Sequence, residues 1–329
     1  QMKKIALSYK KMIKDVGIDI VENPFDQLIV IISRVFHSWE SSKTKTYRKI
    51  MGISDDWGTA VTVQAMVYGN SSQQSGAGVF FTHNPRWSGD TLRLWGDFTL
   101  QNQGEDVVSG LVTTLPISIA QQEIEMRDTD MTLETAFPEI YTELKTWAND
   151  LIYKKGWSPQ EVEFTFESPS KNDLYLLQSR DMVMREREKV FTFDLKEKTD
   201  NKRLGHGIGA GGGAMSGRAV FSLKEIDEWR TKEPNTSLIL VRSDTVPDDI
   251  REIYAADALL TARGGVTSHA AVVAHQLGRT CVVGCGDLLC NEREKYCLFN
   301  DMIIKSGDHI SIDGQEGSVY AGLLEVAEN

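Results

Sequence analysis

The sequence predicts a two-domain protein of mixed α/β and α+β class. Its 329 residues exceed the usual length of one domain. Helix-like and strand-like runs both occur along it, and a glycine-rich stretch at residues 209–213 opens a new region. Residues 183–204 are rich in charged side chains, which is typical of a solvated connection. We therefore expect domains at residues 1–182 and 205–329 with a linker at 183–204.

The first region is expected to begin with helices over residues 1–50. An apolar stripe between Gln27 and Trp39 recurs at helical spacing, and we interpret it as core packing. Alternating apolar residues predict a strand over 59–68. Further strands are expected at 76–81, behind a glycine turn, and at 91–95.

A helix and a hairpin are expected to complete this region. Residues 132–155 have a helical pattern, and the runs at 162–167 and 174–178 predict two strands joined by a turn at 172–173. Glu163 and Gln178 can then point to one face, which Arg180 shares because it lies two residues from Gln178. The simpler alternative is that Glu163 and Arg180 form a surface ion pair.

Bulk composition excludes several classes of protein. The net charge of −11 argues against a general binder of nucleic acid or acidic membranes. No apolar run is long enough to span a membrane, and the first residues lack the core of a signal peptide. The four cysteines have no CxxC spacing, so we expect small, reduced side chains in a cytoplasmic protein rather than a zinc site; they are Cys281, Cys285, Cys290 and Cys297.

The most informative segment runs from Gly264 to Ala274. Residues 258–262 predict a short strand before it, and residues 270–277 predict a helix that ends at Gly278. His269 therefore stands where the helix begins, and Thr267 or Ser268 can cap it. The first N–H groups of the helix would face an anion on the imidazole, and the positive helix end favours a neutral, nucleophilic ring.

A structural role is the alternative for a histidine at a helix start. The eleven residues from Gly264 to Ala274, with Gly-Gly, Thr-Ser-His and Ala-Ala, resemble the phosphohistidine signature of the phosphoenolpyruvate-utilising enzymes. This is the family of pyruvate phosphate dikinase and phosphoenolpyruvate synthase. The resemblance implies that His269 carries a phosphoryl group, supported by Gly264, Gly265, Thr267 and Ser268.

The resemblance extends upstream through residues 63–70, 75–79, 103–110, 162–165 and 176–180. These segments look like the second half of a dikinase nucleotide-binding domain of the ATP-grasp type. The implied fold is thus a partial ATP-grasp domain followed by a swivelling β/β/α phosphohistidine domain.

The same resemblance implies a set of nucleotide-binding residues. Glu163 and Gln178 would hold Mg²⁺ and the phosphates of ATP, and Arg180 would contact the transferred phosphoryl group. Glu105 matches an acid that lies near the nucleotide. Asp97 stands where the dikinases carry Glu.

The implied activity moves phosphoryl from ATP through His269 to pyruvate, with inorganic phosphate as a second acceptor. Alternatives are a synthase-like or other-acceptor enzyme, which the short connection between Arg180 and His269 favours, and a non-catalytic phosphocarrier. The matched region begins after one ATP-grasp subdomain and ends before the family's phosphoenolpyruvate/pyruvate barrel. We expect both to be supplied elsewhere, with any homodimer forming through the barrel.

Overall fold

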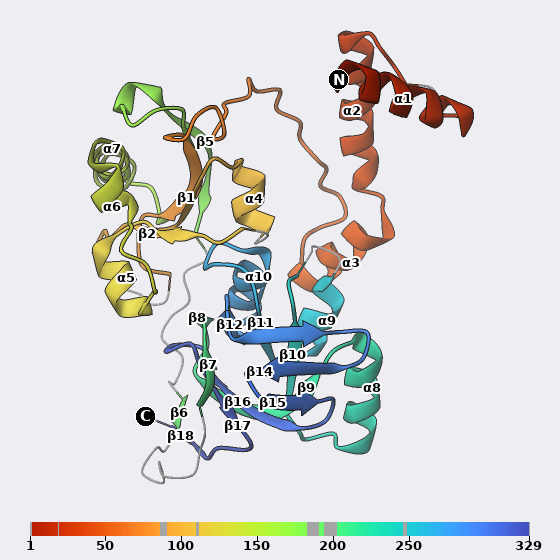
Figure 1. Cartoon of the computed structure of the whole chain (residues 1–329), viewed down its shortest axis with the longest axis vertical. Coiled ribbons are helices and arrows are strands. Elements are labelled where there is room, and N and C mark those ends of the chain that lie inside the picture. The colour runs from red at the N-terminus through yellow and green to blue at the C-terminus, as the bar shows by residue number, and fades with distance from the viewer. Residues whose placement is uncertain are drawn as a thin grey trace. The chain divides into compact units, whose positions relative to one another are not determined.

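The computed structural model describes residues 2–18, 20–85, 91–109, 112–182, 191–193, 203–245 and 249–328. The chain divides into two compact units, residues 1–65 and 66–329, which are described separately. The first unit, red to orange in Figure 1, contains three helices: α1 (Met2–Asp15), α2 (Pro24–Ser38) and α3 (Ser42–Met51). Asn23 caps α2, because its side chain accepts hydrogen bonds from the backbone N–H groups of Phe25 and Asp26.

The expected helices over residues 1–50 are confirmed, but two other expectations for this region are wrong. The apolar stripe of α2 is not core: among the described residues, α1 and α2 bury no side chain, and Ile29 and Phe36 are exposed. Burial needs a second apolar layer, which this small unit does not provide. Residues 59–68 form no strand either, since no described strand pairs with them, and Val63 is exposed.

The second unit begins with a five-stranded antiparallel sheet in the order β3-β2-β1-β4-β5. Its strands are β1 (Gly76–Phe81), β2 (Trp95–Leu100), β3 (Leu115–Pro116), β4 (Gln160–Phe166) and β5 (Leu174–Asp181). The hairpin β4–β5 is confirmed, with the turn η2 (Lys171–Asp173) between its strands. The prediction of a strand at residues 91–95 is wrong, because β2 starts only at Trp95, where its pairing with Phe81 begins.

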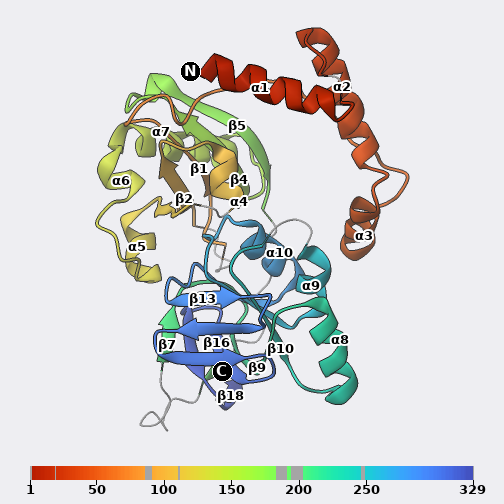
Figure 2. The same cartoon turned by 45° about the vertical axis from the view of Figure 1, so that its right-hand side comes forward.

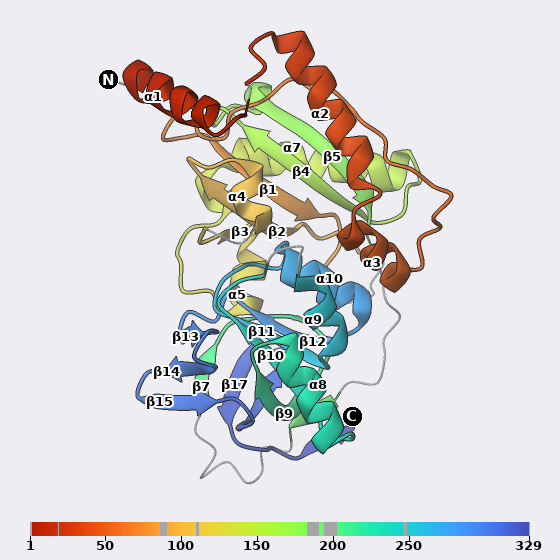
Figure 3. The same cartoon turned by 90° about the vertical axis from the view of Figure 1, so that its right-hand side faces the viewer.

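Short helices surround this sheet: α4 (Gly104–Ser109), α5 (Ile119–Glu125), α6 (Leu133–Ala136), α7 (Pro138–Asn149) and the π-helical turn η1 (Asp150–Lys154). The helix expected at 132–155 is present in three pieces, because Pro138 lacks an N–H group and a new helix starts there. Helix α7 covers one sheet face (Figure 3), where Ile140 and Leu144 join a core with Phe98 and Phe164.

The rest of this unit is built on an eight-stranded mixed sheet in the order β7-β17-β16-β9-β10-β11-β12-β8. Strands β9 to β12 are parallel and are connected by helices α8, α9 and α10 (Figure 1). The bounds are β7 (Arg203–His206), β8 (Ile208–Gly211), β9 (Ala214–Val220), α8 (Leu223–Lys232), β10 (Leu238–Arg242), α9 (Ile250–Ala255), β11 (Ala258–Thr261), α10 (His269–Leu277), β12 (Thr280–Val283), β16 (His309–Asp313) and β17 (Ser318–Ala321).

A small three-stranded sheet, visible in front of the large one in Figure 2, packs Cys297 and Phe299 against Ile310 of β16. Its strands are β13 (Leu288–Asn291), β14 (Tyr296–Phe299) and β15 (Met302–Lys305). All four cysteines are free, and burial raises the pKa of the Cys297 thiol to about 12. No described helix combines the length and the apolar composition that crossing a membrane requires.

The expected linker at residues 183–204 lies largely outside the described residues. Within it, β6 (Phe191–Phe193) pairs with β18 (Val326–Glu328), and β7 begins at Arg203. The proposed domain limits stay a prediction, because the compact units divide at a different place, between Ala65 and Met66.

The backbone of the glycine-rich stretch packs closely against a neighbouring segment. A Cβ on Gly209 would lie 2.5 Å from the Gly314 carbonyl oxygen, and a Cβ on Gly314 would overlap the Gly211 carbonyl oxygen. Both obstacles are backbone atoms, which a rotamer change cannot move.

Replacing Gly314 with alanine is therefore expected to lower the free energy of unfolding by at least about 2 kcal/mol, as overpacked core substitutions do. Urea denaturation measures this effect. Gly286→Ala is the matched control, since a Cβ there meets no atom within 4 Å. Equal stability of the two variants would contradict the close packing.

Candidate functional site

His269 is the first residue of α10 and follows the carboxyl end of β11 through residues 262–268. Gly264 has a φ of 100°, a conformation that favours glycine, and a Cβ there would lie 2.8 Å from Ser268 Oγ. Ser268 is the N-cap: its Oγ accepts from Ala271 N at 3.5 Å and donates to the Gly265 carbonyl at 2.7 Å. The expected strand, loop and helix are confirmed, and Gly278 ends the helix with a φ of 66°.

The body of α10 is anchored by four buried apolar residues, Ala270, Ala271, Val273 and Ala274. A helix fixed in this way holds its first residue in a defined place. His269 is half-buried there, beside backbone N–H groups that have no acceptor within the helix. These groups and the helix dipole favour an anion on the imidazole ring.

Four polar side chains share one face of the β4–β5 hairpin. Glu163 is paired with Gln178 in the strand register, and Glu161 is paired with Arg180. Because side chains of a strand alternate between faces, all four project to the same side. Three of them were predicted from the sequence, and Glu161 was missed, although its position two residues before Glu163 was the available signal.

The ion pair on this face differs from the alternative that the sequence offered, a pair between Glu163 and Arg180. Arg180 Nη2 donates to Glu161 Oε1, not to Glu163, because Glu161 lies directly opposite Arg180 across the hairpin. Glu161 is largely buried, whereas Gln178 and Arg180 are exposed. Arg180 is thus held by a buried carboxylate while its guanidinium remains accessible to a ligand.

Glu163 carries its charge in an unfavourable setting. Burial raises the pKa of its carboxyl group, the nearby Arg180 opposes that effect, and Glu161 adds to it. A cation between the two carboxylates would relieve this cost, and carboxylate and amide oxygens are ligands that suit Mg²⁺. The described residues contain no cluster of three His, Cys, Asp or Glu, so phosphate oxygens would have to complete such a site.

Replacing Glu163 with glutamine is expected to stabilise the fold slightly at neutral pH. A carboxyl group whose pKa is raised by folding binds its proton more tightly in the folded state, so its ionisation costs stability as the pH rises through the raised pKa. Water screens a half-exposed group, so we expect a gain of about 2 °C or less in Tm. Thermal unfolding at pH 7 and pH 4 measures it; a gain that is as large at pH 4 would contradict the assigned cause.

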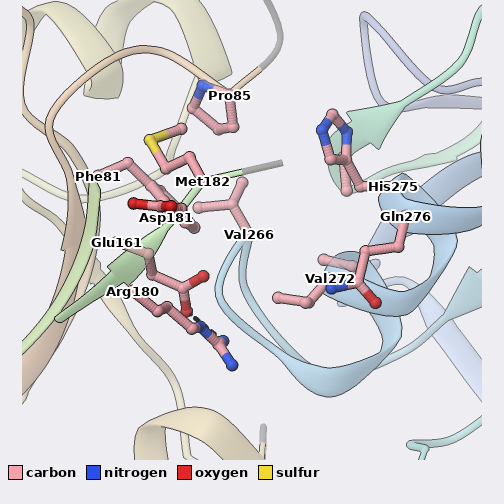
Figure 4. A pocket seen from close by; sticks show the side chains of 12 residues that line it. Phe81, Pro85, Glu161, Arg180, Asp181, Met182, Val266, Val272, His275 and Gln276 are labelled. Carbon is pink, nitrogen blue, oxygen red and sulfur yellow. Dashed lines mark hydrogen bonds and ion pairs between the residues drawn. The ribbon is translucent and has the colours of Figure 1, made fainter. Parts of the chain in front are cut away.

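The face with Glu161 and Arg180 and the helix that begins at His269 line one pocket (Figure 4). Its cavity volume is about 70 Å³, and the pocket is partly open to solvent. Phe81, Pro85, Asp181 and Met182 complete the wall on the sheet side. Ala210, Val266, Ala271, Val272, His275 and Gln276 form the other side. Two carboxylates and a guanidinium of the sheet therefore share this pocket with side chains of α10, but His269, Glu163 and Gln178 are not among its described lining residues.

The remaining predicted residues lie outside this face. Glu105 is exposed in the first turn of α4, and within the described chain it makes no hydrogen bond or ion pair with Glu163 or Gln178. Asp97 is fully buried in β2, where its carboxylate binds Arg127 and Thr267. Nucleotide binding by Glu105 and Asp97 stays a prediction.

Models of known protein families match two segments of the chain, and the first of these ends before the β4–β5 hairpin. Residues 22–143 match the model of the pyruvate phosphate dikinase AMP/ATP-binding domain, and residues 234–317 match that of the mobile domain of PEP-utilising enzymes. The second match includes His269 and its loop.

Curated relatives align over nearly the whole chain. Pyruvate, phosphate dikinase of Clostridium symbiosum is 34% identical over 99% of this chain and 39% of its own length. The Rhizobium meliloti protein of the same name is 36% identical over 97% of this chain and 38% of its own length. The chloroplastic Arabidopsis thaliana protein, pyruvate, phosphate dikinase 1, is 33% identical over 99% of this chain and 35% of its own length.

This chain spans less than two fifths of the length of these relatives. The matches nevertheless favour the dikinases over the synthase branch and over a non-catalytic carrier. On the two domain matches and these relatives, the chain belongs to the pyruvate phosphate dikinase family of PEP-utilising enzymes.

Proposed function

We propose that this chain is the phosphohistidine-bearing part of an ATP-dependent phosphotransferase that makes or consumes phosphoenolpyruvate. In this proposal, the five-stranded sheet is the remaining part of an ATP-grasp site. The part around the eight-stranded sheet is the swivelling domain that carries His269 to a distant pyruvate site. ATP, inorganic phosphate and pyruvate are the substrates, and the cytoplasm is the proposed location.

The first step would join His269 to ATP. A neutral imidazole nitrogen attacks the β-phosphorus of ATP and forms an N–P bond. The bond between the β-phosphorus and the oxygen that bridges it to the α-phosphate breaks, and AMP leaves with that oxygen. The start of α10 supplies backbone N–H groups to the new anionic group.

The hairpin face would stabilise the charge that moves in this step. Glu161, Glu163 and Gln178 offer the oxygens that would hold Mg²⁺, which neutralises phosphate charge when bound. Arg180, steadied by Glu161, can donate two hydrogen bonds to the transferred group. Positioning and charge neutralisation are the main contributions that phosphoryl transfer requires of a protein.

The later steps use the same histidine. Transfer of the terminal phosphoryl group to inorganic phosphate releases pyrophosphate and leaves phosphohistidine. Attack by the enolate oxygen of pyruvate then breaks the N–P bond and forms phosphoenolpyruvate. The neutral ring is regenerated for another cycle.

One observation carries the proposal: the helix that begins at His269 and the face with Glu161 and Arg180 line the same pocket. The test is to incubate a full-length protein carrying this chain with Mg-ATP labelled at the β-phosphorus. We expect acid-labile label on His269 that inorganic phosphate and pyruvate, added together, then remove. Label elsewhere in the chain, or no label at all, would overturn the proposal.

A further inference from the structure

We propose that Gln160 is a positioning residue for the ATP-driven step, which holds the end of β5 in place so that Arg180 can reach the transferred phosphoryl group. This inference rests on the proposed function and deepens it, because Gln160 acts through Arg180 and not on the substrate.

The side-chain amide of Gln160 is buried at a position where an apolar residue would be the simpler choice. Gln160 begins β4 and is 2% exposed. The alternate residues Val162, Phe164 and Phe166 of this strand are buried in one hydrophobic core. Gln160 lies at the end of this row, and a buried amide costs free energy unless its polar atoms are hydrogen-bonded. The glutamine therefore depends on specific partners.

The partners of this amide are the two residues on either side of Arg180. Gln160 Oε1 accepts a hydrogen bond from Ser179 Oγ at 2.7 Å, and Gln160 Nε2 donates to Asp181 Oδ1. An ionised carboxylate can only accept, so Asp181 fixes which end of the amide faces it. Hydrogen bonds from Ser158 and Gln160 lower the pKa of the Asp181 carboxyl group, which favours the ionised form. One side chain thus binds both chain neighbours of Arg180.

The place of β5 in the sheet explains why Arg180 needs this support. In the described part of the chain, β5 is an edge strand that pairs only with β4, and Arg180 is its last residue but one. The ends of such strands open more easily than central strands, because fewer contacts hold them.

Gln160 itself is fixed to the centre of the sheet. Thr82 N donates to the Gln160 carbonyl oxygen, and Gln160 N donates to Thr82 Oγ1, both at 2.9 Å. Thr82 directly follows β1, the central strand. The amide therefore links the edge strand that carries Arg180 to the most firmly held part of the sheet.

The amide holds β5 from behind the candidate phosphate site. Gln160 is paired with Asp181 in the strand register, and Glu161 is paired with Arg180. Because side chains alternate between faces, the Gln160 side chain projects away from the face that carries Glu161 and Arg180. The guanidinium of Arg180 thus stays accessible to a ligand while its backbone is held. Such support affects the rate, since a displacement of about 1 Å can slow a reaction ~10²-fold.

The experiment measures single-turnover phosphorylation of His269 by Mg-ATP in a full-length protein carrying this chain. Gln160→Met removes the amide but continues the buried apolar row, so the fold should persist, which circular dichroism checks. The rate at saturating Mg-ATP is expected to fall about 10–10²-fold, with little change in the Mg-ATP concentration that gives half the maximal rate. Ser179→Ala, at an exposed position, removes one hydrogen bond to the amide and should slow the step about two- to tenfold.

A double variant separates positioning from a general loss of structure. Gln160→Met combined with Arg180→Ala should be no slower than Arg180→Ala alone, because the amide acts through Arg180. Asn149→Leu is the matched control: its half-buried amide donates to the Lys145 carbonyl within α7, and the rate should not change.

Phosphorylation of His269 by phosphoenolpyruvate should also be unchanged in Gln160→Met, since the proposed route for it does not use Arg180. A normal rate with Mg-ATP in Gln160→Met, or additive losses in the double variant, would overturn the positioning role while the proposed function stands. Absence of acid-labile label in the unsubstituted protein would instead overturn the proposed function.

Discussion

Replacing His269 with alanine is expected to abolish nucleotide-dependent phosphorylation completely. Alanine has no nucleophilic nitrogen, and the structure supplies no substitute at the start of α10. Because residue 269 lies at the first helical position and alanine is a strong helix former, α10 should remain folded. Chemical mapping of acid-labile phosphate after incubation with Mg-ATP measures the loss, and circular dichroism checks the fold.

His275 is the informative control for this experiment. It lines the pocket between the sheet and α10, so its location alone does not exclude it as an acceptor. It lies in the last turn of α10, however, away from the backbone N–H groups at the helix start. His275→Ala should keep most of the label, and label that survives in His269→Ala but vanishes in His275→Ala would reverse the assignment.

Replacing Arg180 with alanine is expected to slow phosphorylation of His269 by ATP about 10²–10³-fold, the usual loss when one transition-state charge contact is removed. The fold should persist, because Arg180 is about half exposed and only its partner Glu161 is largely buried. Single-turnover labelling with saturating Mg-ATP measures the chemical step directly.

Two further variants define what Arg180 contributes. Arg180→Lys keeps the charge but loses the planar fork, so it should recover part of the rate. Arg230→Ala removes a comparably exposed arginine of helix α8 from its ion pair with Asp257, far along the sequence, and should leave labelling unchanged. Near-normal labelling by Arg180→Ala would mean that the pair with Glu161 is only structural.

The sequence predicted best where local rules decide. Gly264, Ser268 and Gly278 have conformational and capping roles that follow from their residue types, and all three occupy the expected places. The hairpin that carries Glu163 and Gln178 was equally predictable, because strand alternation and turn residues act within twenty positions.

Contacts between distant segments could not be predicted in the same way. The pairing of Arg180 with Glu161 depends on strand register, which the alternation pattern alone left uncertain by two residues. The link from Asp97 to Thr267 joins segments with no shared local pattern. The apolar residues of α2 show the reverse problem, since periodicity indicates a helical face and does not say whether another layer covers it.

The order of strands in the large sheet has a consequence for how the protein folds. Strand β9 lies between β10, which follows it closely in sequence, and β16, which comes much later. Ser216 of β9 forms hydrogen bonds with Ser311 and Leu324, which lie 95 and 108 residues further along the chain. The early strands β6 and β7 likewise pair with β18 and β17. The long chain segments between these paired strands must close into loops before the strand contacts can stabilise the fold, and this makes folding slow. During synthesis, the segment bearing His269 would therefore leave the ribosome before the strands that complete its sheet, and the finished sheet would form only after residues 309–328 have emerged.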